Sequence, residues 1–184
     1  MEFNKYSTTS GEIILYTGKP NKTILEKLST GPGDIWHSSL DQSYKNTFQD
    51  LVYFAATFWW HFNDYDGLDS CLSWRVNPNA FAIRESIWEQ IHHFDEDYST
   101  EHMKGLDFGF KALKNSGAVV LHQKDLFKAE ENKIKINQSD RYLFYRKNLK
   151  YSHALYMLFR KGFWKLQEWK YYFQAKKSTS KAKE

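Results

Sequence analysis

The chain has 184 residues, 41% of them hydrophobic and 26% charged, which favours one globular domain with a buried core. Its single cysteine, Cys71, excludes an internal disulfide framework and a zinc site made of four cysteines, and it fits a reducing compartment. There is no apolar run of about 18 residues and no basic segment leading into a long apolar one. We therefore expect no transmembrane span, no signal peptide and a cytoplasmic location.

The net charge of +4 hides an acidic body and a basic tail. Residues 141–184 hold 12 Lys and Arg against 2 Glu, a charge of +10, whereas residues 1–140 carry −6. A basic tail of this kind favours an anionic partner, either a membrane surface or nucleic acid. Nucleic acid is the less favoured partner, because no DNA- or RNA-binding motif accompanies the charge.

The first part of the chain is predicted to alternate short strands and helices. An apolar run bounded by glycines is typical of a buried strand, and a helix is expected where Asn21 can cap it and a Gly-Pro-Gly run can end it. Length alone favours a helix in the aromatic stretch that follows. In order, we predict a strand within 11–19, a helix within 21–33, a strand within 34–40, a helix within 44–62 and a polar loop at 63–70.

The second part continues this alternation. A strand at 73–84 is broken by Asn77-Pro78-Asn79, and in 101–117 apolar residues recur with helical period. The predicted order is this strand, a helix at 85–94, a loop at 95–100, a helix at 101–117, a strand at 118–122, one or two helices at 139–175 that break near Gly162, and a disordered tail at 176–184. The pattern predicts an α/β fold with a mixed sheet.

Several pieces of this sequence resemble, in their order and spacing, the second, acceptor-side half of family 2 glycosyltransferases. The pieces are "AIRESIWEQI", "HHFDEDY", "DFGFKALKNSG" and "AVVLH", with "GDIWHSSL" and "NDYDGLDSCLSWR" upstream and the basic "FYRKNLKY" downstream. The resemblance covers roughly residues 12–150. It implies a partial glycosyltransferase-type domain at 1–138 that lacks the N-terminal donor half, followed by a basic aromatic helical segment at 139–175.

The resemblance also implies an activity: transfer of a sugar from a nucleotide-sugar to a glycan or lipid-linked acceptor, as in cell-surface polysaccharide biosynthesis. Members of the family use Mg²⁺ or Mn²⁺, held by an Asp-x-Asp motif, and a carboxylate that acts as general base. Here the position of the metal motif is Tyr16-Thr17-Gly18, and Lys104-Gly105 replace an acidic pair. Phe127 and Lys128 stand where a metal-binding histidine is often found. The alternative is therefore a non-catalytic binding or scaffolding module, a pseudoenzyme recruited to a membrane.

The candidate catalytic residues are Glu101 and Asp107. Glu101 could shift into the position of the base, or it could be an acid favoured by the helix dipole, and Asp107 could be structural. The candidate substrate-binding residues are Trp74, Arg75, His37 and Lys111. Lys111 stands where the family has an arginine. For Trp74 the alternative is core packing, and for His37 it is a structural role. Asp64 and Asp66 spell Asp-x-Asp and are the candidate metal ligands, unless they belong to a solvated loop.

The basic segment is also rich in aromatic residues. Residues 141–175 hold 12 of the chain's 33 aromatics. Phe163, Leu166, Trp169 and Phe173 recur near helical spacing among Lys161, Lys165 and Lys170, which is typical of a helix lying in a membrane interface. The alternative is a basic amphipathic helix packed on its own domain. We expect a protein that is peripheral on the inner face of the cell membrane.

Overall fold

A computed structural model describes residues 2–45, 47, 67–91, 93–131, 134, 136–149 and 151–181. The strands are β1 (Asn4–Ser7), β2 (Ile13–Tyr16), β3 (Ile35–His37), β4 (Ser70–Leu72), β5 (Phe81–Arg84) and β6 (Val120–Gln123). The helices are α1 (Lys22–Ser29), the 3₁₀ turn η1 (Ser39–Gln42), α3 (Glu85–Trp88), α4 (Glu101–Asn115), α5 (Gln138–Asn148), α6 (Tyr151–Gly162) and α7 (Leu166–Lys181).

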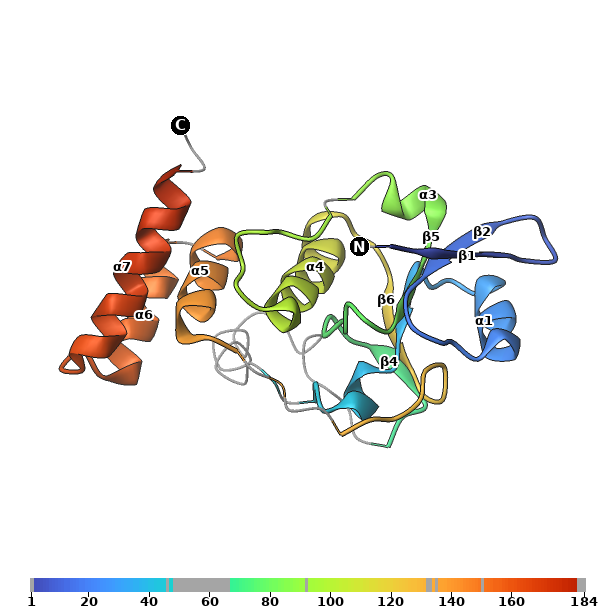
Figure 1. Cartoon of the computed structure of the whole chain (residues 1–184), viewed down its shortest axis with the longest axis horizontal. Coiled ribbons are helices and arrows are strands. Elements are labelled where there is room, and N and C mark those ends of the chain that lie inside the picture. The colour runs from blue at the N-terminus through green and yellow to red at the C-terminus, as the bar shows by residue number, and fades with distance from the viewer. Residues whose placement is uncertain are drawn as a thin grey trace.

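The strands form one mixed sheet in the order β1-β2-β5-β3-β6-β4, which confirms the predicted α/β class (Figure 1). β3 and β6 are parallel, and the other neighbours are antiparallel. Successive strand residues point to opposite faces, so Ile14 and Trp36 pack against Leu25 of α1, while Leu15 and Ile35 pack on the side of Phe108 of α4. The sheet therefore lies between α1 and α4.

Helix α4 approaches the chain before β5 very closely. A Cβ added at Gly105 would lie 2.4 Å from the carbonyl oxygen of Val76, and one at Gly109 would lie 2.1 Å from that of Trp74. Phe108 on the same helix packs 5.7 Å from Phe81 of β5, measured between ring centroids. The two glycines in "KGLDFGFK" thus let the helix fix the backbone of residues 74–78.

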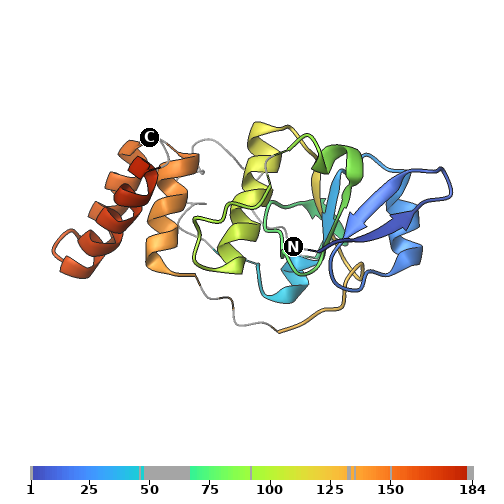
Figure 2. The same cartoon turned by 45° about the horizontal axis from the view of Figure 1, so that its top comes forward.

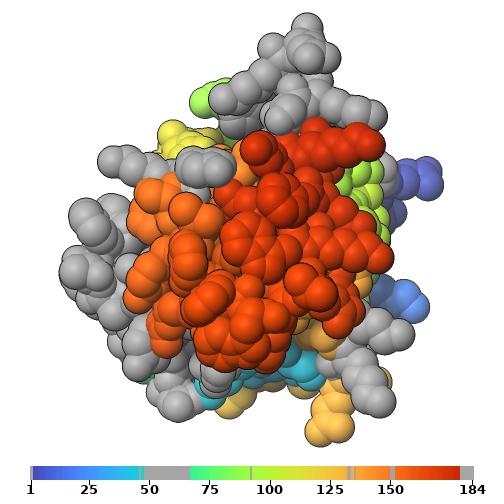
Figure 3. Space-filling view, turned by 90° about the vertical axis from the view of Figure 1, so that its left-hand side faces the viewer, coloured from blue at the N-terminus to red at the C-terminus, as the bar shows by residue number. Residues whose placement is uncertain are grey.

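The C-terminal helices form a further layer outside α4. Helix α5 packs on α4, and α6 and α7 pack on α5 (Figures 1 and 2). One continuous cluster of buried side chains joins these layers: Phe110 of α4, Leu143 and Phe144 of α5, Leu158 of α6 and Tyr172 of α7. Figure 3 looks onto α6 and α7 from outside.

Several boundaries differ from those predicted. α3 has only four residues instead of ten, because the chain turns after Trp88 and packs Phe94 against Phe108, 4.7 Å between centroids. The break at Gly162 is confirmed, but α7 runs to Lys181 where disorder was expected from residue 176. β4 lies partly in the predicted loop, and β1 was not anticipated. Of the helix predicted at 44–62, residues 46 and 48–62 lie outside the described part.

Candidate functional site

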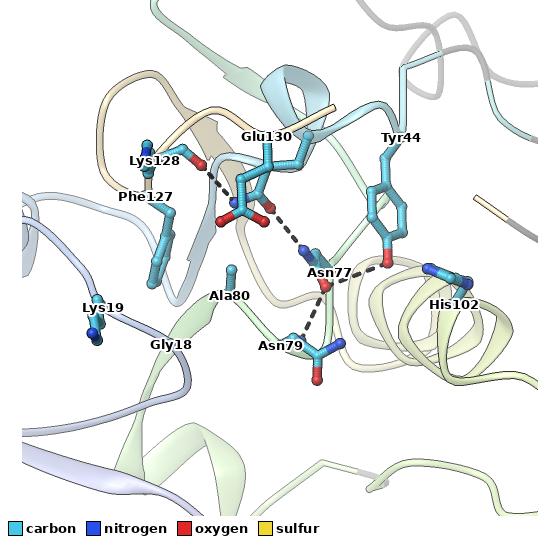
Figure 4. A pocket seen from close by; sticks show the side chains of 11 residues that line it. Gly18, Lys19, Tyr44, Asn77, Asn79, Ala80, His102, Phe127, Lys128 and Glu130 are labelled. Atoms are coloured by element: carbon cyan, nitrogen blue, oxygen red, sulfur yellow. Dashed lines mark hydrogen bonds between the residues drawn. The ribbon is translucent and has the colours of Figure 1, made fainter. Parts of the chain in front are cut away.

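A cavity of about 570 Å³ opens where β2, β3 and β6 reach their carboxyl ends, beside the segment that leads into β5 (Figure 4). This edge of an α/β sheet is where ligands commonly bind. The lining residues come from five separate parts of the chain: Gly18, Lys19, Gln42, Tyr44, Asn77, Asn79, Ala80, His102, Phe127, Lys128 and Glu130. We refer to this cavity as the cleft.

Two serines at the end of β3 hold the two walls of the cleft. The Ser39 hydroxyl accepts a hydrogen bond from the backbone N–H of Asn77 at 2.8 Å. The Ser38 hydroxyl donates to the carbonyl of Gln123 at 2.6 Å and accepts from the N–H of Phe127 at 2.8 Å. Because both serines are buried, the segments after β6 and before β5 are tied to the same strand end.

The end of β2 closes the third side. The Thr17 hydroxyl donates to the carbonyl of Pro78 at 3.0 Å, and the N–H of Phe81 donates to that hydroxyl at 3.2 Å. Gly18 has φ of +69°, and a Cβ there would lie 2.7 Å from the carbonyl oxygen of Asn79. Glycine is thus required at residue 18 both for the turn and for the close approach of the two backbones.

A chain of side-chain hydrogen bonds forms one wall (Figure 4). The Asn77 carbonyl oxygen Oδ1 accepts from the Tyr44 hydroxyl at 3.3 Å and from the N–H of Asn79 at 3.0 Å. The Asn77 amide donates to the Gln42 side-chain oxygen at 2.8 Å, and the Gln42 amide donates to the carbonyl of Lys128 at 3.0 Å. Asn77 thereby links three of the lining segments.

The remaining lining groups vary in charge and polarity. Lys19 and Lys128 bring positive charge, Glu130 brings a carboxylate, and Phe127 brings an aromatic ring. Burial, followed by the nearby charge of Glu101, raises the pKa of Tyr44 well above its ordinary value, so Tyr44 stays a neutral hydroxyl. Such a cleft can offer hydrogen-bond donors, acceptors and an apolar face to one small ligand.

A second hollow of similar volume, about 580 Å³, lies over α1. Its acid, Glu26, already accepts hydrogen bonds from the hydroxyl of Tyr6 at 2.7 Å and from the N–H and hydroxyl of Thr9. The hollow is more open than the cleft and its charged group is engaged locally. The cleft is therefore the stronger candidate.

The predicted base Glu101 begins α4 but does not line the cleft. It is exposed and forms an ion pair with Lys104 at 2.8 Å, and Lys104 also pairs with Glu96. The next residue, His102, does line the cleft, and its ring lies 5.8 Å from that of Tyr44. The α4 start thus reaches the cleft through His102 and not through Glu101.

Asp107, the other candidate catalytic residue, lies in the interior and does not line the cleft, which fits the structural alternative. The carboxylate is completely buried, where Tyr98 donates to it at 2.7 Å, Asn148 donates to it at 2.5 Å, and Lys111 forms an ion pair at 2.6 Å. Lys111, predicted to bind substrate, also pairs with Asp95 at 3.1 Å. Asp107 and Lys111 join α4 to α5 and to the loop before α4, and neither lines the cleft.

Trp74, Arg75 and His37 are also interior residues rather than cleft residues. Trp74 is fully buried against Phe110 and Phe144. The Arg75 guanidinium donates to the carbonyl of Thr47 at 3.0 Å and lies over the Trp74 ring.

The His37 ring bonds the carbonyl of Ser73 and the N–H of Ser39, and burial lowers its pKa to about 3, so it stays neutral. Because Nδ1 accepts from the Ser39 N–H, Nε2 carries the proton and donates to Ser73.

The metal prediction falls on Asp64 and Asp66, which lie outside the described residues. Among the residues that are described, no three His, Cys, Asp or Glu side chains come together in a way that could hold a metal ion. Of the candidate residues that the structure describes, none lines the cleft, and Gly18 and Lys128 were singled out in the sequence only as positions that depart from the family's metal-binding pattern. Gln42 and Tyr44 carried no signal in the sequence.

Comparison with protein families, with curated proteins and with solved structures finds no significant match to this chain. Within the described part, no helix is both long enough and apolar enough to cross a bilayer.

Proposed function

We propose that the chain is a family 2 glycosyltransferase-like protein. Its cleft binds the sugar of a glycan or lipid-linked acceptor, and this acceptor receives a sugar from a nucleotide-sugar. One observation carries the proposal. Segments that the resemblance assigns to a single site, namely Gly18 after β2, the start of α4, and Phe127-Lys128 after β6, all border the same cleft. They are far apart in sequence, so this convergence is a property of the fold.

The chemistry of the walls supports a polyhydroxyl ligand. A sugar hydroxyl both donates and accepts hydrogen bonds, and so do the side chains of Gln42, Tyr44, Asn77 and Asn79. The ring of Phe127 offers a flat apolar surface for the C–H face of a sugar. Lys19 and Lys128 offer positive charge to a phosphate on the donor or on a lipid-linked acceptor.

The groups with the chemistry to accept a proton from the acceptor hydroxyl are Glu130 and His102, which line the cleft, and Glu101, which directly precedes His102 in the chain. A general base must come within hydrogen-bond reach of the proton that it removes. We assign this role first to Glu130, because Figure 4 shows its carboxylate among the lining side chains, between Phe127 and Asn77. Glu101 stays the second candidate.

The family's metal does not fit the described residues. Mg²⁺ and Mn²⁺ prefer several oxygen ligands, including carboxylates. The cleft has one carboxylate, Glu130, and the position of the metal motif is occupied by Tyr16-Thr17-Gly18. We therefore assign no step to a metal held by these residues.

The single carboxylate favours a second candidate function, a module that binds a glycan without transferring a sugar. The Lys104-Gly105 pair supports this alternative further, because Lys104 neutralises Glu101 and Glu96 where the family has acids. In both cases the same cleft binds the acceptor sugar. The two candidates differ only in whether turnover follows binding.

The test combines turnover and binding. The protein is incubated with a panel of nucleotide-sugars and glycans, with Mg²⁺ or Mn²⁺ added, and released nucleotide and ligand-observed NMR signals are measured. Glu130→Gln is compared with Glu89→Gln, which removes an exposed acid away from the cleft. Turnover lost only in Glu130→Gln supports the transferase. Glycan binding without turnover supports the module, and neither binding nor turnover with any sugar contradicts both.

We also propose that this protein works at a membrane surface. The basic charge of residues 141–184 supports this location, as do the aromatic residues in the same segment.

A further inference from the structure

The turn between α6 and α7 carries an unusual concentration of exposed apolar side chains. Among the described residues, eight large hydrophobic side chains are exposed, and six of them belong to residues 156–173. Trp164 and Leu166, at the turn itself, are 70% and 85% exposed. In Figure 1 this turn lies at the opposite end of the molecule from α1. We call residues 159–166 the tip.

The tip is ordered by its own contacts. The rings of Phe159 and Phe163 lie 5.8 Å apart, and those of Phe163 and Trp164 lie 5.3 Å apart. The indole N–H of Trp169 donates to the carbonyl of Phe163 at 2.6 Å, and Gly162 takes the positive φ of +111° that the turn requires. The exposed rings are therefore held together as one surface before any partner binds.

Part of the expected interfacial helix face is already packed against the protein's own core, which changes the expectation from the sequence. Phe163, Leu166, Trp169 and Phe173 were predicted to form one interfacial helix face. In the structure Trp169 is half-buried against the core cluster that contains Tyr172, whereas Phe163 and Leu166 project from the turn. A helix lying flat on a membrane would have to expose that core. Outside the tip, the exposed large apolar side chains of the hairpin are Tyr156 and Phe173, both 51% exposed, so the most exposed apolar surface is the tip with Trp164 and Leu166.

The tip and the start of α7 carry positive charge. Arg160, Lys161 and Lys165 lie within it, and Lys170 follows one turn into α7. The acid of α7, Glu168, accepts a hydrogen bond from the hydroxyl of Tyr142 on α5 at 2.7 Å and so is directed toward the helical core. Exposed aromatic rings with basic residues on the same turn match the boundary between lipid headgroups and acyl chains, where rings sit at headgroup depth and ammonium groups meet anionic lipid.

We propose that the tip, through Trp164 and Leu166, inserts into the surface of an anionic bilayer while Lys165 and Lys170 contact lipid phosphates. This inference deepens the proposed membrane location by naming the inserting surface. The bilayer is preferred over a second copy of the chain because the rings are few and project from a turn, whereas a stable dimer needs a broad complementary face. The charge complementarity is with anionic lipid.

The experiment is sedimentation of the full chain with vesicles of phosphatidylcholine, with and without phosphatidylglycerol. Binding is expected to require the anionic lipid. Trp164→Ser with Leu166→Ser should lower the partition coefficient roughly tenfold or more, because two apolar side chains are lost from the inserted surface. Lys165→Gln and Lys170→Gln should each lower it about fivefold.

Matched controls separate these effects from general loss of charge or apolar surface. Leu68→Ser removes an exposed leucine away from the hairpin, and Lys22→Gln with Lys27→Gln removes two exposed lysines of α1. None of these should change vesicle binding. As a positional readout, an environment-sensitive dye on Leu166→Cys should shift on vesicle binding, and the same dye on Lys22→Cys should not, with Cys71 replaced by Ser in both proteins.

Three results would overturn the proposal. The first is an absence of binding to anionic vesicles, and the second is binding that the tip variants leave unchanged. The third is a tip that instead mediates concentration-dependent self-association or binding to RNA, which the same variants would abolish. Because the tip does not line the cleft, sugar binding should persist in every tip variant. Failure of the membrane proposal and failure of the cleft proposal are therefore distinguishable.

Discussion

Two polar regions lie on either side of α4, and they differ in how their groups are paired. In the interface with α5, the Asp107 carboxylate is enclosed by Tyr98, Lys111 and Asn148, and no part of it is exposed. In the cleft, Asn77 and Gln42 are paired with each other, while the exposed side chain of Asn79 borders an open volume.

The comparison shows why residue type alone is a poor guide to a site. An aspartate in a helix that resembles a catalytic helix is, here, the centre of a closed network that fixes α5 against α4. Buried polar groups need full pairing because an unpaired one loses its hydration without compensation. Groups that border a cavity can instead complete their hydrogen bonds with a ligand.

The largest expected effect comes from breaking the closed network. Asp107→Ala would leave the mostly buried Lys111 without its closest partner and the donors of Tyr98 and Asn148 without their acceptor, so we expect about 3–5 kcal/mol lower free energy of unfolding. Asp107→Asn, which keeps an acceptor for Tyr98, should cost less. Urea unfolding measures both. Full stability in Asp107→Ala combined with lost sugar binding would reverse the roles assigned to the two regions.

The second effect concerns His37, which lies buried behind the cleft wall. Burial lowers its pKa from 6.5 to about 3, so the unfolded chain binds a proton below pH 6.5 that the folded chain does not. The contribution of neutral, buried His37 to the free energy of unfolding is complete above pH 6.5. It is lost on acidification toward pH 3, by about 1.4 kcal/mol for each pH unit. The loss between pH 6.5 and pH 4 should therefore be about 3 kcal/mol.

The measurement is urea unfolding of the native chain and of His37→Gln across this pH range. The carboxylates are common to both proteins, so the difference between the two curves isolates the histidine. The variant should be less stable at neutral pH and should lose less stability on acidification. Parallel curves would mean that His37 is protonated in the folded state, contrary to its two hydrogen bonds.

The parts of the fold that the sequence predicted are those with strong internal patterns. The strands at 13–16 and 81–84 are apolar runs bounded by turns, and the helix at 101–115 has a clear 3.6-residue period. β1 and β4 were missed or misplaced because they are the two edge strands of the sheet. Their short, mostly polar or mixed sequences are ordered by pairing with β2 and β6 rather than by burial of their own side chains.

The candidate site was harder to predict than the strands and helices, because it too depends on contacts between residues far apart in the sequence. Trp74, Asp107 and His37 were selected for their chemistry, but whether such groups face a cavity depends on neighbours far away in sequence. Gln42 and Tyr44 matter because both bond Asn77, more than thirty residues further along the chain. No local pattern records such a contact. Gly18 and Phe127-Lys128 were noted in the sequence only as departures from the family's metal-binding pattern, not as candidate site residues.

The smallest expected change in stability comes from substitutions in the cleft wall, and these substitutions also test whether a sugar contacts that wall. Asn77→Ala removes the group that joins Tyr44, Gln42 and the N–H of Asn79, so it should lower the free energy of unfolding by about 1–3 kcal/mol and weaken sugar binding as the wall loosens. Asn79→Ala changes an exposed side chain at the same cavity and should leave the free energy of unfolding within about 0.5 kcal/mol of the native value while still weakening sugar binding.

Urea unfolding and glycan titration by NMR would be measured on both variants. If Asn79→Ala binds sugar normally while Asn77→Ala does not, then Asn77 acts only through the fold and the ligand does not contact this wall.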